Sequence, residues 1–424
     1  MRRLALVFSA ALVASSSCIA APAYVEGTAG GGGTGTGAGG GAGPGTGAGG
    51  AGGEGGVTQI DPPAPAWCRF HGTVNNETLF DLRRAPADKG LVGGGGFTGP
   101  LVFDQALTPL GSSDGYIAYF DQSGEPGGAY QVGASQIGVV GSLVVSDAGQ
   151  VFGLGTLVGD LGAFVGDGSE DLFAFEAGVG PVLAAGTALS DGLFDGQTFG
   201  SFAYLTGDSD APGLDLGTGA ISSGGVVAGL DLATSSVVWA IPLGAGNAPG
   251  SGHNIKVTAS GDAWASVALG GPGLTDVVCN GENLVTTAPR QPALLKLGPD
   301  GVCTRGRLLP SEMFEDLDLA VLDGERPVLS GHFTGTMIVD GVEATSQAGL
   351  EDAFFAVFDD NGDLVTLTTY GGLGTETPNE LVLDAAGDAY VVGEFLGSFR
   401  AGTMTAESLP DGAQAVFVLK MAPT

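Results

Sequence analysis

The chain has 424 residues, 80 of them glycine, and its 46 acidic against 14 basic side chains give a formal net charge of −32. So acidic a surface repels phosphates and anionic lipid headgroups, which argues against nucleic-acid or anionic-membrane binding through a basic patch. Apolar residues make up 43% of the chain, enough to build a large core. An acidic composition is typical of proteins that are soluble outside the cell. Carboxylates are also the ligands that Ca²⁺ prefers.

Residues 1–23 are expected to be an export signal. Two arginines precede an apolar run at residues 4–14, which is too short to span a bilayer. Two processing routes remain open. Cleavage after the small residues 21–23 would release a soluble protein, whereas a lipoprotein-type signal would place a lipid on Cys18. Both routes predict export, with the protein either secreted or held at the outer membrane or cell surface.

Residues 24–60 are expected to form a disordered linker. Residues 27–56 are almost purely Gly, Ala and Thr, so this tract has little to bury and great backbone freedom. A flexible chain of about thirty residues has a mean reach of about 30 Å, which suits a tether fixed at a membrane. The GxGxxG match at residues 35–40 lies within this tract. It lacks the strand and helix that a dinucleotide site needs.

A repeated pattern organises residues 61–424. Apolar strands that end just before a turn recur at spacings of 55, 55, 67, 61 and 63 residues. A period of this length indicates one supersecondary unit stacked many times, here about the size of a four-stranded propeller blade with one long loop. The six strands end at Phe120, Phe175, Leu230, Leu297, Phe358 and Met421.

The strand patterns predict how these units pack. The segments 353–358 and 415–419 are continuous apolar runs, which indicates strands covered on both faces. Propeller blades cover their strands in this way by packing blade against blade. Pro242 and Pro310 fall in the segments after the turns, and proline belongs on an edge strand. These segments are therefore expected to be the outermost, fourth strands.

The last unit stops just after its third strand. The segment 66–72, AWCRFHG, is expected to supply the missing fourth strand and so to close the ring without free edges. The predicted fold is therefore an all-β propeller of six four-stranded blades, with seven blades as the alternative.

The repeat resembles a known family. The pattern VLDAAGDAYVVGEF followed by AVFVLK, together with AFFAVFDDNGDLVTLTTYGG, is similar to the SBBP-type β-propeller repeat of bacterial secreted and surface proteins. A Gly-rich tether behind a lipoprotein-like signal is similar to surface proteins of myxobacteria. The resemblance covers roughly residues 66–424, although the family name implies seven blades. It implies a propeller and a cell-envelope location, but neither a defined activity nor catalytic residues.

Two cysteines are expected to form a disulfide. Cys279 and Cys303 lie 24 residues apart in one unit of an exported protein. Cys68 would remain in the closing strand. The cysteines contain no CxxC pair, so they do not predict a metal site.

The sequence predicts no catalytic site. Residues 111–115 match the GxSxG motif but lead into a strand, whereas a nucleophile elbow needs a following helix. The three histidines have no zinc-site spacing. No cofactor is expected, except that Asp208, Asp210 and Asp215 lie together in one long loop and are candidate ligands for Ca²⁺. The Asp-rich segment 359–363 is interpreted as a tight turn.

The expected function is binding without catalysis, as an adhesion or scaffold module. The partner would be an envelope or extracellular polysaccharide or protein, and the protein is expected to be a monomer. Long loops on a rigid scaffold usually carry recognition, so the ligand is expected on their face of the ring. The alternatives are a polysaccharide hydrolase or lyase, with acidic side chains from several blades converging in the central channel, and a self-assembling surface-layer component.

Overall fold

The computed structural model describes residues 77–85, 90–166, 168–221, 224–244, 250–314, 317–347, 350–384, 387–408 and 415–421. Over these ranges the chain is all-β and contains no α-helix, so none is present there that could cross a membrane. The predicted export signal, Cys18, the Gly-rich linker, Cys68 and the proposed closing strand 66–72 lie outside the described residues.

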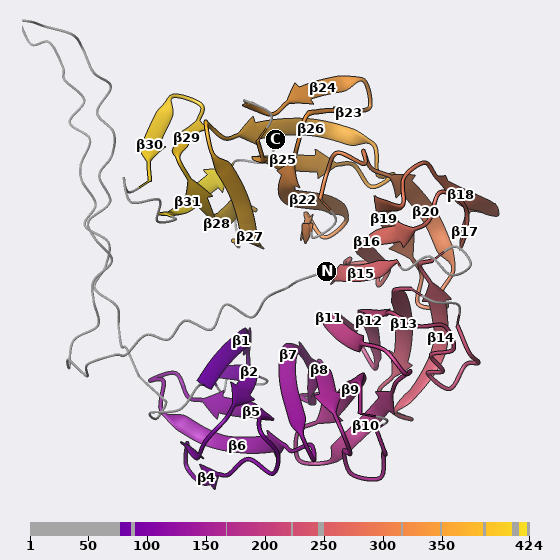
Figure 1. The fold of residues 1–424 in the computed structure, drawn as a ribbon, viewed down its shortest axis with the longest axis vertical. Coiled ribbons are helices and arrows are strands. Elements are labelled where there is room, and N and C mark those ends of the chain that lie inside the picture. The colour runs from indigo at the N-terminus through magenta and orange to yellow at the C-terminus, as the bar shows by residue number, and fades with distance from the viewer. Residues whose placement is uncertain are drawn as a thin grey trace, which may run out of the picture. The chain divides into compact units, whose positions relative to one another are not determined.

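Six small antiparallel sheets, the blades, follow one another in chain order round a ring (Figure 1). Each blade begins with its innermost strand. The first three blades are β1(Glu77–Arg84), β2(Leu91–Phe97), β5(Asp114–Phe120) and β6(Pro126–Val132); β7(Ile137–Val145), β8(Val151–Val158), β9(Glu170–Glu176) and β10(Gly180–Ala185); and β11(Asp191–Phe199), β12(Phe202–Ser209), β13(Val226–Asp231) and β14(Ser236–Pro242).

The other three blades repeat this plan. They are β15(Ser251–Val257), β16(Ala263–Gly270), β19(Arg290–Leu297) and β20(Cys303–Leu308); β21(Asp318–Leu322), β22(Arg326–Phe333), β25(Asp352–Phe358) and β26(Leu364–Tyr370); and β27(Thr375–Leu383), β28(Ala389–Leu396) and β31(Ala415–Met421). The sixth blade thus has three strands within the described residues.

The predicted six units are confirmed. Strands β5, β19, β25 and β31 end at the predicted residues, and β9 and β13 end one residue later than Phe175 and Leu230. Pro242 ends β14, an edge strand that pairs only with β13. Proline is tolerated there because an edge strand needs no ladder hydrogen bond on its outer side.

Hydrophobic cores lie between neighbouring blades, as the apolar runs predict. One core joins the second and third blades, through Leu154 and Leu205 among others. Another joins the fifth and sixth, through Phe355 and Phe417. Every residue of β25 is buried, whereas the outer strand β26 is largely half-buried or exposed. Burial on both faces therefore distinguishes the third strand of the fifth blade from its fourth, whereas β31, the third strand of the sixth blade, exposes Val416 and Val418, contrary to the prediction for 415–419.

Four connections between second and third strands contain hairpins, although three of them, at residues 268–292, 332–352 and 394–414, were expected to be loops. These hairpins are β3(Leu101–Val102) with β4(Ala106–Leu107), β17(Gly273–Cys279) with β18(Glu282–Thr286), β23(Thr336–Val339) with β24(Val342–Thr345), and β29(Ser398–Ala401) with β30(Met404–Glu407). Each buries apolar side chains, including Leu107, Val277, Met337 and Phe399. They therefore cover the outer parts of the blades.

Candidate functional site

The innermost strands carry a polar side chain at equivalent positions. Five of the six, all but β21, have a register shift, a β-bulge, against the second strand of their blade. A bulge re-aims the side chains beside it and is common at functional sites. The residues directly after the bulges are Asp81, Ser142, Asp195, Asn254 and Glu380. We call these five residues the inner ring.

Asp81 joins the first blade to the second. Its Oδ2 accepts hydrogen bonds from the Leu143 backbone N–H at 2.8 Å and from the Ser142 hydroxyl at 3.2 Å. The same oxygen lies 2.9 Å from Nε of Arg83 on its own strand. One carboxylate oxygen therefore holds two adjacent innermost strands together.

Asp195 plays the same part between the third and fourth blades. Its Oδ2 accepts the backbone N–H of Ile255 at 3.1 Å and lies 2.7 Å from Nζ of Lys256. Its Oδ1 lies 3.4 Å from Nη2 of Arg83, which reaches across from the first blade. Burial disfavours the charged form of Arg83, but the carboxylates of Asp195 and Asp81 outweigh burial and raise its pKa.

Asn254 continues the pattern with an amide. Its Nδ2 donates to the backbone oxygen of Leu317 at 2.9 Å and to Asp318 Oδ1 at 3.4 Å. The fourth blade is thereby joined to the fifth. Hence three inner-ring residues each bond to the innermost strand of the next blade, or to the residue just before it.

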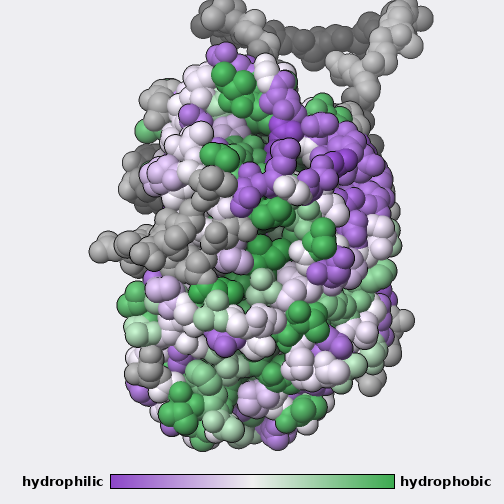
Figure 2. All heavy atoms as spheres, turned by 90° about the vertical axis from the view of Figure 1, so that its right-hand side faces the viewer, coloured by the Kyte–Doolittle hydropathy of each residue, from purple (hydrophilic) through white to green (hydrophobic). Residues whose placement is uncertain are grey.

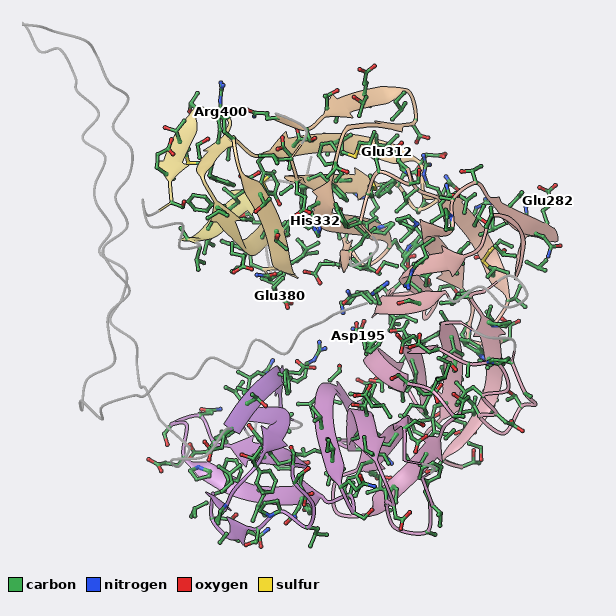
Figure 3. All side chains as sticks on the ribbon, in the orientation of Figure 1. Asp195, Glu282, Glu312, His332, Glu380 and Arg400 are labelled. Atoms are coloured by element: carbon green, nitrogen blue, oxygen red, sulfur yellow. A yellow bond between two sulfur atoms is a disulfide. The ribbon has the colours of Figure 1, made fainter. Side chains whose placement is uncertain are left out.

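Glu380, on β27 of the sixth blade, differs from the other acids. It is exposed, and no hydrogen bond or ion pair joins it to another described residue. Figure 3 shows Glu380 and Asp195 facing the centre of the ring. The surrounding protein raises the pKa of Glu380 by desolvation, and the charges of Lys256 and Arg83 lower it only in part.

Acidic side chains from three blades thus converge at the centre of the ring. Asp81 and Asp195 accept hydrogen bonds from backbone N–H groups and cations, which fixes the positions of their carboxylates. Glu380 is held by no such bond and is more easily protonated. The centre therefore combines two structural carboxylates with one carboxyl group open to the solvent.

A pocket of about 460 Å³ lies where the innermost strands of the first three blades end. The turns that follow these strands are the short ones, between first and second strands. Leu143 and Val145 supply aliphatic surface. The polar side chains of the lining are Arg83, Arg84, Ser146, Asp147, Gln197 and Thr198. Hydrogen-bond donors and acceptors, among them positively and negatively charged groups, thus line one pocket next to the inner ring.

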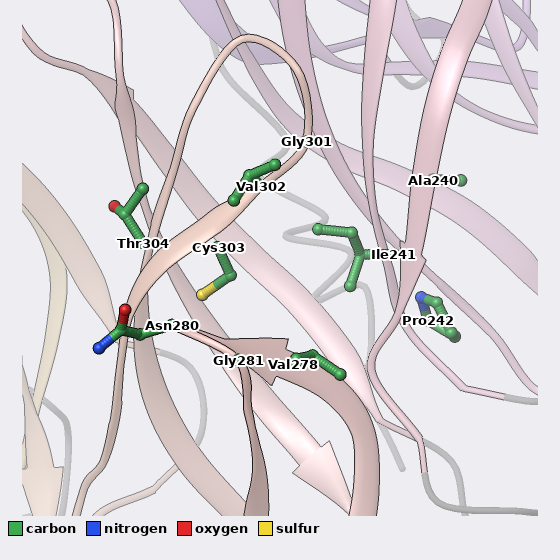
Figure 4. A pocket seen from close by; sticks show the side chains of 10 residues that line it. All are labelled: Ala240, Ile241, Pro242, Val278, Asn280, Gly281, Gly301, Val302, Cys303 and Thr304. Carbon is green, nitrogen blue, oxygen red and sulfur yellow. The ribbon is translucent and has the colours of Figure 1, made fainter.

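A second pocket, of about 480 Å³, lies on the outer side of the ring between β14 and the β17–β18 hairpin (Figure 4). Its lining is uncharged and includes Ile241, Pro242, Val278 and Val302. Figure 2 shows the molecule from this side, where apolar patches lie among hydrophilic ones.

The two predicted disulfide partners are bonded to each other. Cys279, at the end of β17, and Cys303, at the start of β20, have Cα atoms 4.5 Å apart. Their residues also form the single parallel pairing between β17 and β20. The bond ties the covering hairpin to the outer strand of its blade.

The three aspartates predicted as Ca²⁺ ligands do not form a metal site here. Among the described residues, no three His, Cys, Asp or Glu side chains are grouped to hold a metal ion. Asp215 Oδ1 instead accepts the backbone N–H groups of Gly217 and Gly219, at 2.8 and 3.1 Å. Its carboxylate is therefore occupied by its own turn, while Asp208 lies on β12 and Asp210 just after it.

The other motifs are turns, as predicted. In the GxSxG match, Ser112 donates its hydroxyl to the backbone oxygen of Gln136, and Asp114 begins β5. In the segment 359–363, Asp359 accepts the backbone N–H groups of Asn361 and Asp363, both at 2.9 Å. The bond from Asp363 contributes most to lowering the pKa of Asp359.

The inner ring was not predicted from the sequence. Asp195 and Lys256 are 61 residues apart, and nothing local marks either as functional. A usable signal exists in the repeat itself, because Asp81, Asp195 and Glu380 occupy the same position of the first strand in their units. Aligning the units on first strands rather than on third strands would show it.

Together the fold and the inner ring define a six-bladed β-propeller with a polar centre. No family model and no curated protein matches the chain. Hydrazine synthase from Kuenenia stuttgartiensis is similar in structure, with a TM-score of 0.40, 9% identity and coverage of 67% of this chain and 72% of that one. A protein of unknown function from Bacteroides caccae has a TM-score of 0.33, 11% identity and coverage of 65% and 78%. With TM-scores below 0.5, neither likeness bears on function.

Proposed function

We propose that this protein is a binding module without catalytic activity, whose ligand occupies the pocket beside the inner ring. The observation that carries the proposal is the pocket of about 460 Å³ at the ends of three innermost strands. Three blades contribute to its lining, and the bonds of Asp81 and Asp195 hold the strands on which it is built. Binding sites are typically concave and largely pre-formed, with a few placed polar groups.

The chemistry of the lining favours a polyhydroxylated ligand, such as an envelope or extracellular polysaccharide. Sugar hydroxyls donate and accept hydrogen bonds, and the lining offers donors in Arg84 and Gln197 and an acceptor in Asp147. The lining has two arginines and one aspartate, and Arg83 is already paired with Asp81 and Asp195, so a strongly charged ligand gains little. This position differs from the face of the long loops, where the sequence predicts the ligand.

Co-sedimentation with insoluble polysaccharides and with cell-envelope fractions tests the proposal. The full chain should bind at least one of them saturably, and Arg84→Ala with Asp147→Ala should weaken binding by about tenfold, as expected for polar groups at a site centre. Two outer residues, Glu282 and Arg305, provide the control, because both are exposed and lie outside the lining. Equal loss in the control variant would place the ligand elsewhere.

A second candidate, a polysaccharide hydrolase, is favoured by Glu380 alone. A carboxyl group with a raised pKa near ionised carboxylates is the pattern of a general acid beside a base. Against it, both oxygens of Asp195 are already engaged, Oδ2 by the Ile255 N–H and Lys256 and Oδ1 by Arg83. Release of reducing sugar ends that is lost in Glu380→Gln would establish this activity, whereas binding without turnover supports the module.

We also propose that the protein is exported and, through Cys18, held at the cell surface on its Gly-rich tether. The basic and apolar start of the sequence and the tract at 27–56 support this proposal. Incorporation of a labelled fatty acid that disappears in Cys18→Ser would test lipidation. Release of the unlabelled protein into the medium would favour cleavage at residues 21–23 instead.

A further inference from the structure

Two acidic side chains lie at the junction between the fifth and sixth blades, away from the inner ring, where the N–H of Glu376 donates to the backbone oxygen of Glu351, the residue before Asp352, at 3.0 Å. Asp352 is the first residue of β25, and Glu376 is the second residue of β27. Between them the chain passes through Gly371 and Gly372. A Cβ on Gly371 would lie 2.4 Å from Cγ of Asp352, so only glycine fits. The next N–H, that of Gly372, donates to Glu376 Oε2 at 3.3 Å.

Both carboxyl groups are buried and only partly satisfied. Glu376 is 0% exposed and Asp352 is 3% exposed. The Gln347 backbone N–H donates to Asp352 Oδ2 at 3.1 Å. The other two oxygens, Asp352 Oδ1 and Glu376 Oε1, are buried and accept no hydrogen bond from any described residue.

The same arrangement occurs at the junction between the second and third blades. There Asp171 packs against Gly186, and the N–H of Thr187 donates to Asp191 Oδ2 at 2.6 Å. Asp171 and Asp191 are 1% and 2% exposed. A buried aspartate against a glycine, followed by an N–H that donates to a second buried carboxylate, is therefore repeated at two junctions of the ring.

Two ionised carboxylates cannot stay buried side by side, because each loses its hydration and each repels the other. Either a cation or a proton must neutralise one of them. A Ca²⁺ ion needs six to eight oxygen ligands, and no cluster of three metal-ligating side chains occurs in the described chain. A proton needs only two oxygens, and two unpartnered oxygens are present.

We propose that Asp352 and Glu376 share one proton, and that this acid pair makes the junction between the fifth and sixth blades sensitive to pH. Glu376 carries the proton and Asp352 remains ionised. Loss of the proton leaves two negative charges in the buried junction. The sixth blade then loosens from the fifth, at the end of the chain where the described ring has three strands instead of four.

The direction of the pH effect follows from the protonation states. Burial and then the charge of Asp352 raise the pKa of Glu376 to about 7. The unfolded chain releases this proton near pH 4.3, so the folded protein binds more protons between about pH 4.3 and about pH 7. Stability therefore falls as the pH rises through this window, and the loss is complete above it.

The other titratable groups near the pair include acids, one histidine, Tyr370 opposite Ala353, and Arg400, whose backbone pairs with that of Gly371. Glu351 precedes Asp352 and raises the pKa of Glu376 further. The strands packed against β27 carry Asp318 on β21, His332 on β22 and Glu394 on β28. Because other ionisable side chains lie near the pair, the effect of Glu376 is taken as a difference between the protein and its Glu376→Gln variant.

Thermal unfolding of the full chain at several pH values tests the proposal. From about pH 5.5 to about pH 8.5 the Tm of the protein should fall by about 4 °C more than that of Glu376→Gln, which keeps a donor but cannot ionise. The exposed Glu407→Gln is the control and should follow the unsubstituted protein. Hydrogen exchange should locate the change in β27 and β28.

Two further results would overturn the proposal. Calorimetric titration with Ca²⁺ should give the same result for the unsubstituted protein and for Glu376→Gln. Heat of binding that is seen only in the unsubstituted protein would mean that the pair holds a cation. Infrared difference spectroscopy uses only the unsubstituted protein, so its result does not depend on whether a variant folds. It should show the carbonyl band of a protonated carboxyl group disappearing near pH 7, and its absence would mean that no proton is shared.

Discussion

Nζ of Lys256 lies 2.7 Å from Oδ2 of Asp195, and the two residues belong to the innermost strands of neighbouring blades. The side chain of Asp195 is only 7% exposed, and it also meets Arg83 from the first blade. A carboxylate that is screened from water and bonded to two cations fixes the relative positions of three innermost strands. The pocket beside these strands depends on that arrangement.

Removal of this carboxylate should be costly. Asp195→Ala leaves Arg83 and Lys256 without their shared partner and leaves the Ile255 N–H unbonded. We expect a loss of about 2 kcal/mol in the free energy of unfolding, because the Asp195 carboxylate is buried while its partners Arg83 and Lys256 are partly exposed. Chemical denaturation measures it, and Glu282→Ala on the outer surface should change it by less than about 0.5 kcal/mol.

The disulfide should stabilise the fourth blade in particular. Replacing both Cys279 and Cys303 with serine should cost about 3 kcal/mol, because the bond closes a loop of 24 residues in the unfolded chain. The β17–β18 hairpin should then exchange its amide hydrogens faster than the hairpins of the other blades. A reductant should destabilise the unsubstituted protein and leave the double variant unchanged, and equal protection of the hairpin in both proteins would contradict this account.

Asp359 should stabilise the folded protein at neutral pH and lose this effect in acid. Its lowered pKa, caused first by the bond from the Asp363 N–H, means that it contributes stability above the unfolded pKa of about 3.9. That contribution is lost as the pH falls through the lower folded pKa. Asp359→Asn should show a weaker loss of Tm between about pH 5 and about pH 2 than the unsubstituted protein, whereas the neighbouring Asp360→Asn should match it.

Chelation should leave the loop after β12 unchanged. Asp215 already accepts two backbone N–H groups of its own turn, so no Ca²⁺ is needed there. Addition of EDTA is expected to leave the Tm unaltered. A drop in Tm that is reproduced by Asp208→Asn and Asp210→Asn would instead restore the Ca²⁺ site predicted from the sequence.

The outer edge of β31 should be covered by residues 66–72, as the sequence predicts. Within the described residues, β31 pairs only with β28, and Val416 and Val418 are exposed. Deletion of residues 61–72 should lower the Tm and promote association through the open edge. An unchanged Tm with a monomeric protein in light scattering would show that the segment does not close the ring.

The architecture could be predicted because it is repeated in the sequence. The apolar third strands recur six times, and Phe120, Leu297 and Phe358 are strand ends in the structure. Pro242 predicted an outer strand because proline lacks a backbone N–H, and this property can be read directly from the sequence. The bond between Cys279 and Cys303 was predictable because both cysteines lie in one unit.

The centre of the ring could not be predicted in the same way. The bulge before Asp195 depends on how β11 pairs with β12, and the sequence does not display that register. The contacts of Asp195 with Arg83 and Lys256 join residues 112 and 61 positions apart. Long-range ion pairs of this kind arise from the closure of the ring. The hairpins in the long connections could not be predicted either. Met337 and Phe399 are buried by contacts with strands outside their own segment, and the sequence does not display such contacts.

The most direct test of the binding site is a binding isotherm for the full chain on its best polysaccharide or envelope fraction, compared with Arg84→Ala/Asp147→Ala and with Glu282→Ala/Arg305→Ala. The account predicts about tenfold weaker binding for the first variant, unchanged binding for the second and the same thermal stability for both. Unchanged binding by the first variant, at full stability, would contradict a ligand site beside the inner ring.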